Sequence, residues 1–171
     1  MKNWKNPVIA TLVLFLACAL PTLVAAQDSA TIITGPELSK VVPPGFYFEG
    51  QSAPTQMRNA SAARFGKNRY VIVGLVDTSG YAEEVRAKYE GFLITDSPIS
   101  INGSELAIGA YGFGFSNDGK LSVLDLAGNQ VLSLTTSKDT GMKRPRPLML
   151  TKSGDDLRFY SGKDYATIAF K

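Results

Sequence analysis

Turn-forming residues recur about every 8–12 positions beyond Gly45, a spacing typical of all-β proteins. Asn-Gly and Asp-Gly steps, such as Asn102-Gly103, supply the positive φ angles that tight hairpins need. The apolar runs between these turns are too short for helices, which need about ten residues or more. The spacing therefore predicts an all-β fold, an antiparallel β-barrel or β-sandwich rich in meanders.

The predicted strands are rich in Val, Ile, Tyr and Phe, and turn residues bound them. Residues 70–76 are apolar on both faces, so this strand is expected to be central and covered on both sides. Residues 113–170 are expected to run as one antiparallel meander. The predicted strands span residues 45–49, 55–63, 69–76, 85–95, 99–102, 110–115, 120–125, 130–136, 147–151, 157–160 and 165–170.

Residues 81–90 fit two structures. As a helix, Tyr81, Val85 and Tyr89 would line one face at a spacing of four. As a strand, alternate positions from Val85 to Tyr89 would be apolar. Because the segment runs directly into the apolar residues 92–94, we expect a strand over its second half.

The first 26 residues are predicted to be a secretory signal peptide. A basic start precedes an uncharged apolar run over residues 8–20, and Pro21 then breaks the helix. Small residues stand just before the expected cleavage site after Ala26. We therefore expect an exported bacterial protein, either periplasmic or secreted.

Two alternatives would hold the chain at a membrane. Without cleavage, the apolar segment is about long enough to span a bilayer. Lipid attachment at Cys18 is the second alternative, but Leu16 fits poorly where a lipidated cysteine is preceded by small residues. Cleavage near Ala26 is the interpretation that the sequence favours.

Cleavage would remove most of the chain's positive charge. The 171 residues become 145, and the 18 basic residues become 16, because Lys2 and Lys5 are lost, against 15 acidic residues. The net charge falls from +3 to +1. This balance gives no general electrostatic footprint for nucleic acid, so no nucleic-acid partner is expected.

The sequence contains no histidine, and its one cysteine, Cys18, lies in the predicted signal peptide. This excludes Ser-His-Asp and Cys-His catalysis and the common zinc motifs. The adjacent acid pairs, Glu83-Glu84 and Asp155-Asp156, do not converge by spacing alone, because neighbouring strand residues face opposite sides. We predict no enzyme activity, no metal site and no cofactor.

An aromatic stripe is the most distinctive candidate for a ligand site. In a strand, Tyr111, Phe113 and Phe115 share one face, while Gly112 and Gly114 share the other. The glycines would let a neighbouring group pack closely, and the rings could instead fill the core or line a pocket. These five residues are the predicted contacts for a small apolar ligand.

The only basic cluster lies at residues 143–147. Lys143, Arg144 and Arg146 alternate with prolines that hold the segment extended. These three residues are predicted to contact an anionic group or a partner protein of the cell envelope, although a solvated loop also fits the pattern.

Residues 99–113 contain a strand, an Asn-Gly turn and the run Leu106-Ala-Ile-Gly-Ala-Tyr111. This arrangement resembles a hairpin unit of uncharacterised bacterial secreted all-β proteins, and the resemblance extends loosely through Leu134. It implies an exported all-β protein and no particular activity.

No linker divides the chain after the signal peptide, so one domain is expected. Residues 27–44 form its lead-in, with one short helix over residues 36–42 where prolines stand at both ends. Residues 45–171 form the single β domain. We predict a non-catalytic protein that binds a small apolar ligand in the aromatic-lined pocket. The alternative is a structural or interaction module that uses an edge strand or the basic segment 143–147.

Overall fold

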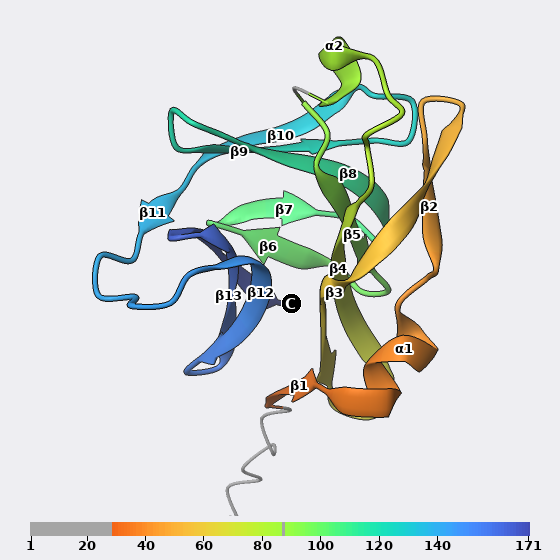
Figure 1. Ribbon diagram of the computed structural model, residues 1–171. Helices are drawn as coiled ribbons and strands as arrows, with labels where there is room; N and C mark the ends of the chain where they lie inside the picture. Colours follow the sequence, from red (N-terminus) through yellow and green to blue (C-terminus); the bar gives the residue numbers. More distant parts are fainter. Residues whose placement is uncertain (1–28, 87) are drawn as a thin grey trace, which may run out of the picture.

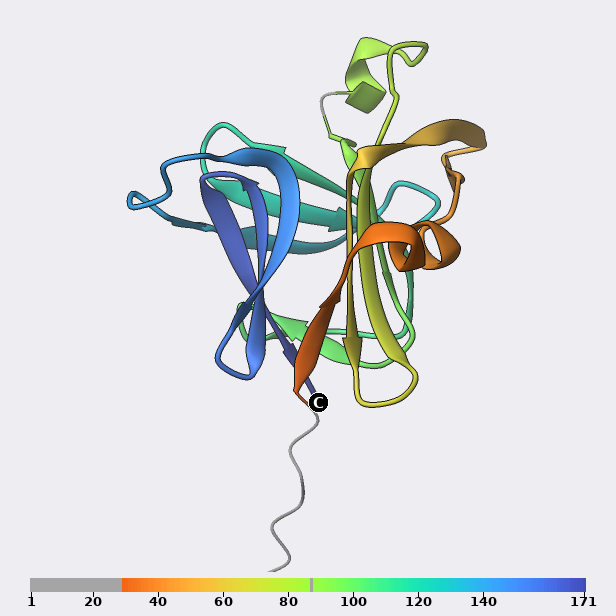
Figure 2. The same ribbon diagram turned by 60° about the horizontal axis from the view of Figure 1, so that its bottom comes forward.

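The computed structural model describes residues 29–86 and 88–171. Two antiparallel β-sheets face each other, and only short helical turns accompany them (Figures 1 and 2). Within the described residues the two sheets do not close into one continuous barrel. The predicted antiparallel all-β fold is therefore confirmed. The predicted signal peptide, its cleavage site at Ala26 and Cys18 lie outside the described residues.

The elements follow one another with short connections. In chain order they are β1 (Ala30–Ile33), a 3₁₀ turn (Gly35–Glu37), α1 (Leu38–Val41), β2 (Gly45–Phe48), β3 (Gln51–Phe65), β4 (Arg69–Val76), α2 (Glu83–Arg86), β5 (Gly91–Thr95), β6 (Ile99–Ile101), β7 (Ser104–Leu106), β8 (Gly109–Ser116), β9 (Lys120–Leu124), β10 (Gln130–Thr135), β11 (Ser137–Lys138), β12 (Arg146–Ser153), β13 (Asp156–Gly162) and β14 (Asp164–Phe170).

The larger sheet has eight strands in the order β1-β3-β4-β5-β8-β9-β10, and β2 adds to β3 outside this path. Strand β4 lies near the middle, as the unbroken apolar run predicts. Val71 and Val73 face the core between the sheets, whereas Val76 belongs to a second cluster on the opposite side. The expectation that this strand is covered on both faces is confirmed.

The smaller sheet has the order β12-β13-β14-β6-β7, with β11 paired to β14. The predicted single meander over residues 113–170 is therefore wrong. Strands β8–β10 belong to one sheet and β12–β14 to the other, and the chain crosses between them at β11. Folding the second half over the first brings the Phe113 and Phe159 rings to 4.9 Å. A continuous sheet would leave these apolar faces without a cover.

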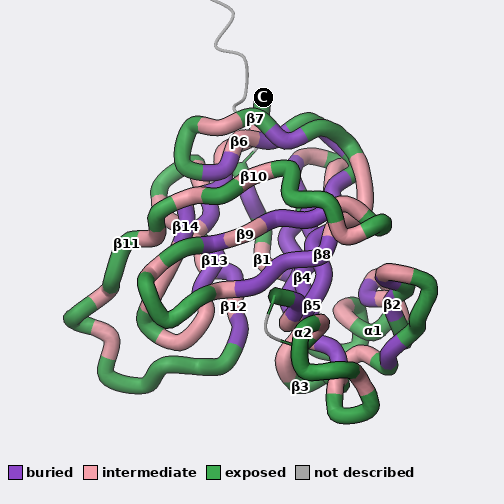
Figure 3. The backbone as a smooth tube through the Cα atoms, turned by 90° about the horizontal axis from the view of Figure 1, so that it is seen from above, coloured by how far each residue is buried: buried purple, intermediate pink, exposed green. Residues whose placement is uncertain are grey.

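The core between the sheets holds most of the buried residues. Phe65, Leu93, Phe113, Leu157 and Phe159 are among them, and each is at most 2% exposed. A smaller cluster on the outer face of the larger sheet lies beneath β2 and α1. Buried positions follow the central strands in Figure 3, whereas the connection from β11 to β12 is largely exposed. The inter-sheet space is thus filled by side chains in its middle.

The predicted strand over the second half of residues 81–90 is wrong. Residues Glu83–Arg86 form α2, and the Tyr89 N–H donates to the Val85 carbonyl at 2.9 Å, as in a helical turn. Tyr81, Val85 and Tyr89 all pack against the outer cluster. Their spacing of four therefore decides the local structure, and the strand begins only at Gly91.

The lead-in is part of the same architecture. Strand β1 pairs with β3, and a helical segment follows it over residues 35–41. Val42 is extended because a proline follows it, so the helix ends one residue earlier than predicted. The short helix predicted between prolines is confirmed.

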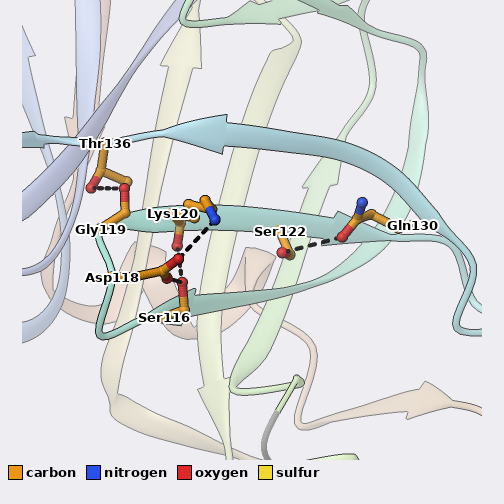
Figure 4. A network of polar contacts seen from close by, with 7 residues as sticks. All are labelled: Ser116, Asp118, Gly119, Lys120, Ser122, Gln130 and Thr136. Carbon is orange, nitrogen blue, oxygen red and sulfur yellow. Dashed lines mark hydrogen bonds and ion pairs between the residues drawn. The ribbon is translucent and has the colours of Figure 1, made fainter.

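Side-chain contacts fix the β8–β9 hairpin (Figure 4). Asp118 accepts a hydrogen bond from Ser116 Oγ and forms an ion pair with Lys120 Nζ at 2.8 Å. Thr136, the residue directly after β10, donates from its Oγ1 to the Gly119 carbonyl at 2.9 Å. The turn is therefore tied to the point at which the chain leaves the larger sheet.

The first strand, β1, and the last strand, β14, both contact Phe65 at the end of β3. Ala30 of β1 pairs with Phe65 at the end of β3, and the Phe65 ring stacks on Phe170 with centroids 3.2 Å apart. The start of β1 and the C-terminus lie near each other in Figure 2.

Candidate functional site

The predicted aromatic stripe lies on β8 and faces the smaller sheet. Phe113 is fully buried and packs edge-on against Phe115 and Phe159, with centroids 6.0 and 4.9 Å away. Tyr111 is half-buried, and its hydroxyl donates to the Ala107 carbonyl at 3.1 Å. The three predicted residues do share one face, where they belong to the inter-sheet core.

The opposite face of β8 carries Gly112 and Gly114. A Cβ atom at Gly112 would lie 2.7 Å from the Phe48 ring and 3.0 Å from the Tyr89 ring. At Gly114 it would lie 2.5 Å from the Lys88 carbonyl oxygen. The close approach that the glycines permit is therefore made by the protein's own chain.

The predicted basic cluster divides between a loop and a strand. Lys143 and Arg144 lie in the exposed connection before β12, while Arg146 is the first residue of β12. Arg146 also borders a hollow of about 360 Å³ between β1 and β12, which we call the β1–β12 groove. It is lined by Ile32, Ile33, Thr34, Gly35, Leu38, Met57, Arg58, Ala60, Ser61, Arg146, Leu148, Met149, Leu150 and Thr151.

The β1–β12 groove combines an apolar lining with two cations. Arg58 and Arg146 are exposed and form no ion pair with the described residues. At the buried side of the groove, Ser61 Oγ accepts a hydrogen bond from the Leu150 N–H at 3.2 Å. This bond joins β3 of one sheet to β12 of the other, and it fixes the position of the groove wall.

A second hollow, which we call the inter-sheet mouth, holds about 350 Å³ where the two sheets open beside α2. Glu90 lies here, half-buried, and its Oε2 accepts a hydrogen bond from the Phe115 N–H at 3.2 Å. Burial raises the pKa of the Glu90 carboxyl, and the Phe115 N–H opposes this shift. The mouth is lined by Gln56, Leu75, Val76, Thr78, Arg86, Tyr89, Glu90, Pro147, Ser161 and Gly162.

Tyr89 borders the same mouth and is 1% exposed. Its ring stacks on Phe48 with centroids 4.1 Å apart. The hydroxyls of Tyr89 and Tyr81 are buried without a hydrogen-bond partner among the described residues. Burial, with a smaller contribution from Tyr81, raises the pKa of Tyr89.

Glu90 was not among the residues that the sequence singled out. One signal was present, since a carboxylate stands directly before the apolar run 91–94 that forms a buried strand. The sequence around Arg58 gave no comparable signal, because its place in the same groove as Arg146 depends on how the two sheets face each other.

Within residues 29–86 and 88–171, no group of three or more acidic, cysteine or histidine residues is placed to hold a metal ion. A search of the same residues finds no helix long and apolar enough to cross a membrane.

Comparison with known proteins returns no matching family model, no matching curated protein and no matching solved structure. The described residues form two antiparallel β-sheets, with hollows of about 350 and 360 Å³ where strands of the two sheets meet.

Proposed function

We propose that this protein is an exported, non-catalytic binding protein that holds a small amphipathic anion in the β1–β12 groove. The observation that carries the proposal is the combination of an apolar lining with two exposed guanidinium groups, those of Arg58 and Arg146, which form no ion pair with the part of the chain that the structure describes. A volume of about 360 Å³ lies within the range of small-molecule sites.

The chemistry of the lining selects the ligand class. Met57 and Met149 are flexible apolar side chains that adapt to irregular ligands, and Leu38 and Leu148 add to the same wall. Arg58 and Arg146 can donate charge-assisted hydrogen bonds to a carboxylate or a phosphate. An acyl chain with a carboxylate head matches both parts of the groove.

The test compares dodecanoate with dodecanol, which has the same chain and no charge, by isothermal titration calorimetry. We expect the double variant R58Q/R146Q to weaken dodecanoate binding by at least about a hundredfold, since each of the two lost hydrogen bonds to a charged group contributes about 1.5–3 kcal/mol. Its affinity for dodecanol should stay unchanged.

A matched control removes two charges from the same basic cluster without touching the groove. The double variant K143Q/R144Q should bind dodecanoate like the unchanged protein. Equal losses in both double variants, or no binding of dodecanoate at all, would reject the proposed function.

Export is part of the proposal and rests on the sequence of residues 1–26. Expression of the full chain in a bacterium should yield a protein whose mature N-terminus is Gln27, because small residues precede that position. Mass spectrometry of the purified protein measures this directly. A mass that retains all 171 residues would contradict cleavage.

A further inference from the structure

The inter-sheet mouth is a site distinct from the β1–β12 groove. Its lining residues come from α2, from β3 and β4 of the larger sheet, from β12 and β13 of the smaller one and from the connections beside them. Leu75, Val76 and Pro147 supply apolar walls, while Thr78 and Ser161 supply hydroxyls.

Within residues 29–86 and 88–171, the Glu90 carboxylate has no counter-ion. One of its oxygens is held by the Phe115 N–H, and no cation of the described residues lies within ion-pair distance of either oxygen. A partly buried charge costs free energy unless an opposite charge accompanies it. The raised pKa of this carboxyl reflects the same cost.

Arg86 borders the same hollow from α2 and is exposed. No ion pair joins its guanidinium to the Glu90 carboxylate, although both face one space of about 350 Å³. The hollow therefore presents a negative group on its inner side and a positive group at its rim, with apolar surface between the sheets.

We propose that the inter-sheet mouth binds a small zwitterion, whose ammonium group contacts Glu90 and whose anionic group contacts Arg86. A short apolar body between these two charges would lie against Leu75, Val76 and Pro147. This arrangement gives Glu90 a counter-ion that the described residues do not supply, and it pairs the exposed Arg86 with the anionic group of the ligand. The inference does not depend on the ligand of the β1–β12 groove.

The Phe115 amide provides a direct reporter, because its N–H bonds to the carboxylate that the ligand would contact. Linear ω-amino acids from glycine to 6-aminohexanoate scan the spacing between the two charges, and ¹H–¹⁵N NMR follows the Phe115 signal. We expect one chain length to bind at least about tenfold more tightly than butylammonium or butyrate, which each carry one of the charges.

Three variants assign the contacts. E90Q keeps an oxygen that can accept from the Phe115 N–H, and it should lose at least about tenfold in zwitterion affinity. R86Q should lower the affinity to that of butylammonium. E84Q removes one negative charge from α2 outside the mouth, so its affinity should be unchanged.

An unchanged circular dichroism spectrum verifies that each variant is folded. Unchanged binding by folded E90Q would overturn the proposal, as would an equal loss in E84Q. A Phe115 signal that no ω-amino acid shifts would also overturn it. None of these outcomes bears on dodecanoate binding in the β1–β12 groove, so the two proposals fail separately.

Discussion

Gly112 has no room for a side chain. Replacing it with alanine would place a Cβ atom 2.7 Å from the Phe48 ring. The Phe48 ring cannot easily move away, because it stacks on the Tyr89 ring. We expect G112A to lower the free energy of unfolding by about 1–3 kcal/mol, the usual cost of overpacking. Urea denaturation measures this change. In G80A the new methyl group meets nothing within 4 Å, so its stability should match or slightly exceed that of the unchanged protein.

The Glu90 carboxyl links stability to pH. Its pKa is raised in the folded protein, so folding favours the protonated form. Below the ordinary pKa of a glutamate, Glu90 is protonated in both the folded and the unfolded chain, and it costs no unfolding free energy. As the pH rises from there through the raised pKa of the folded protein, the unfolding free energy falls. E90Q should therefore gain stability over the unchanged protein between acidic and neutral pH. Denaturation curves across this interval test it, and a difference that is constant with pH would contradict the prediction.

The sequence revealed some side-chain positions better than others. That Tyr111, Phe113 and Phe115 share one face follows from the period of a strand alone. In the structure all three side chains pack in the core between the sheets. Which of the two faces meets the other sheet depends on packing across the whole fold. Glu90 and Arg86 line one hollow for the same reason, since strands from both sheets form the other walls of that hollow.

Strands β3 and β12 are joined by one hydrogen bond outside the sheet ladders. Ser61 Oγ is the acceptor for the buried Leu150 N–H, so S61A leaves that donor without a partner. We expect a loss of about 1–3 kcal/mol in unfolding free energy, together with faster exchange of the Leu150 amide. The exposed S52A variant on the same strand should stay within about 0.5 kcal/mol of the unchanged protein. Undiminished protection of Leu150 in S61A would contradict this role.

Long apolar runs such as β4 are predictable, because turn residues mark both ends of the run and apolar residues on both of its faces indicate a central strand. The short strands β7 and β11 are not. Strand β7 exists because Glu105 and Leu106 pair with Ser100 and Ile99 across a tight turn, and β11 exists because β14 passes beside it. Their structure comes from a neighbour and leaves little trace in their own residues.

The two sheets share one core, so they should unfold together. Phe159 of the smaller sheet contacts Phe113 and Phe115 of the larger one. We expect F159A to cost about 3–5 kcal/mol and to lower amide protection in β9 and β13 by the same factor. The control V131A changes a side chain that is 43% exposed on β10, and its effect should be small. Loss of protection in β13 alone would show that the sheets unfold independently.

The antiparallel all-β class follows from turn spacing, but the division of the strands between two sheets does not. Nothing in residues 130–138 distinguishes a turn within one sheet from a crossing to the next. The crossing is decided by the aromatic faces that must be covered, and those faces become visible only when β8 and β13 lie opposite each other.

Phe65 lies between the first strand and the last, pairing with Ala30 and stacking on Phe170. A short flexible linker could therefore join the end of β14 to the start of β1, and the order of the elements along the chain could be changed while each element keeps its place in the fold. New termini opened at the exposed turn around Gly154 would leave both sheets with their present neighbours. A circular permutant of this kind should fold, and its β1 would then be covalently continuous with β14.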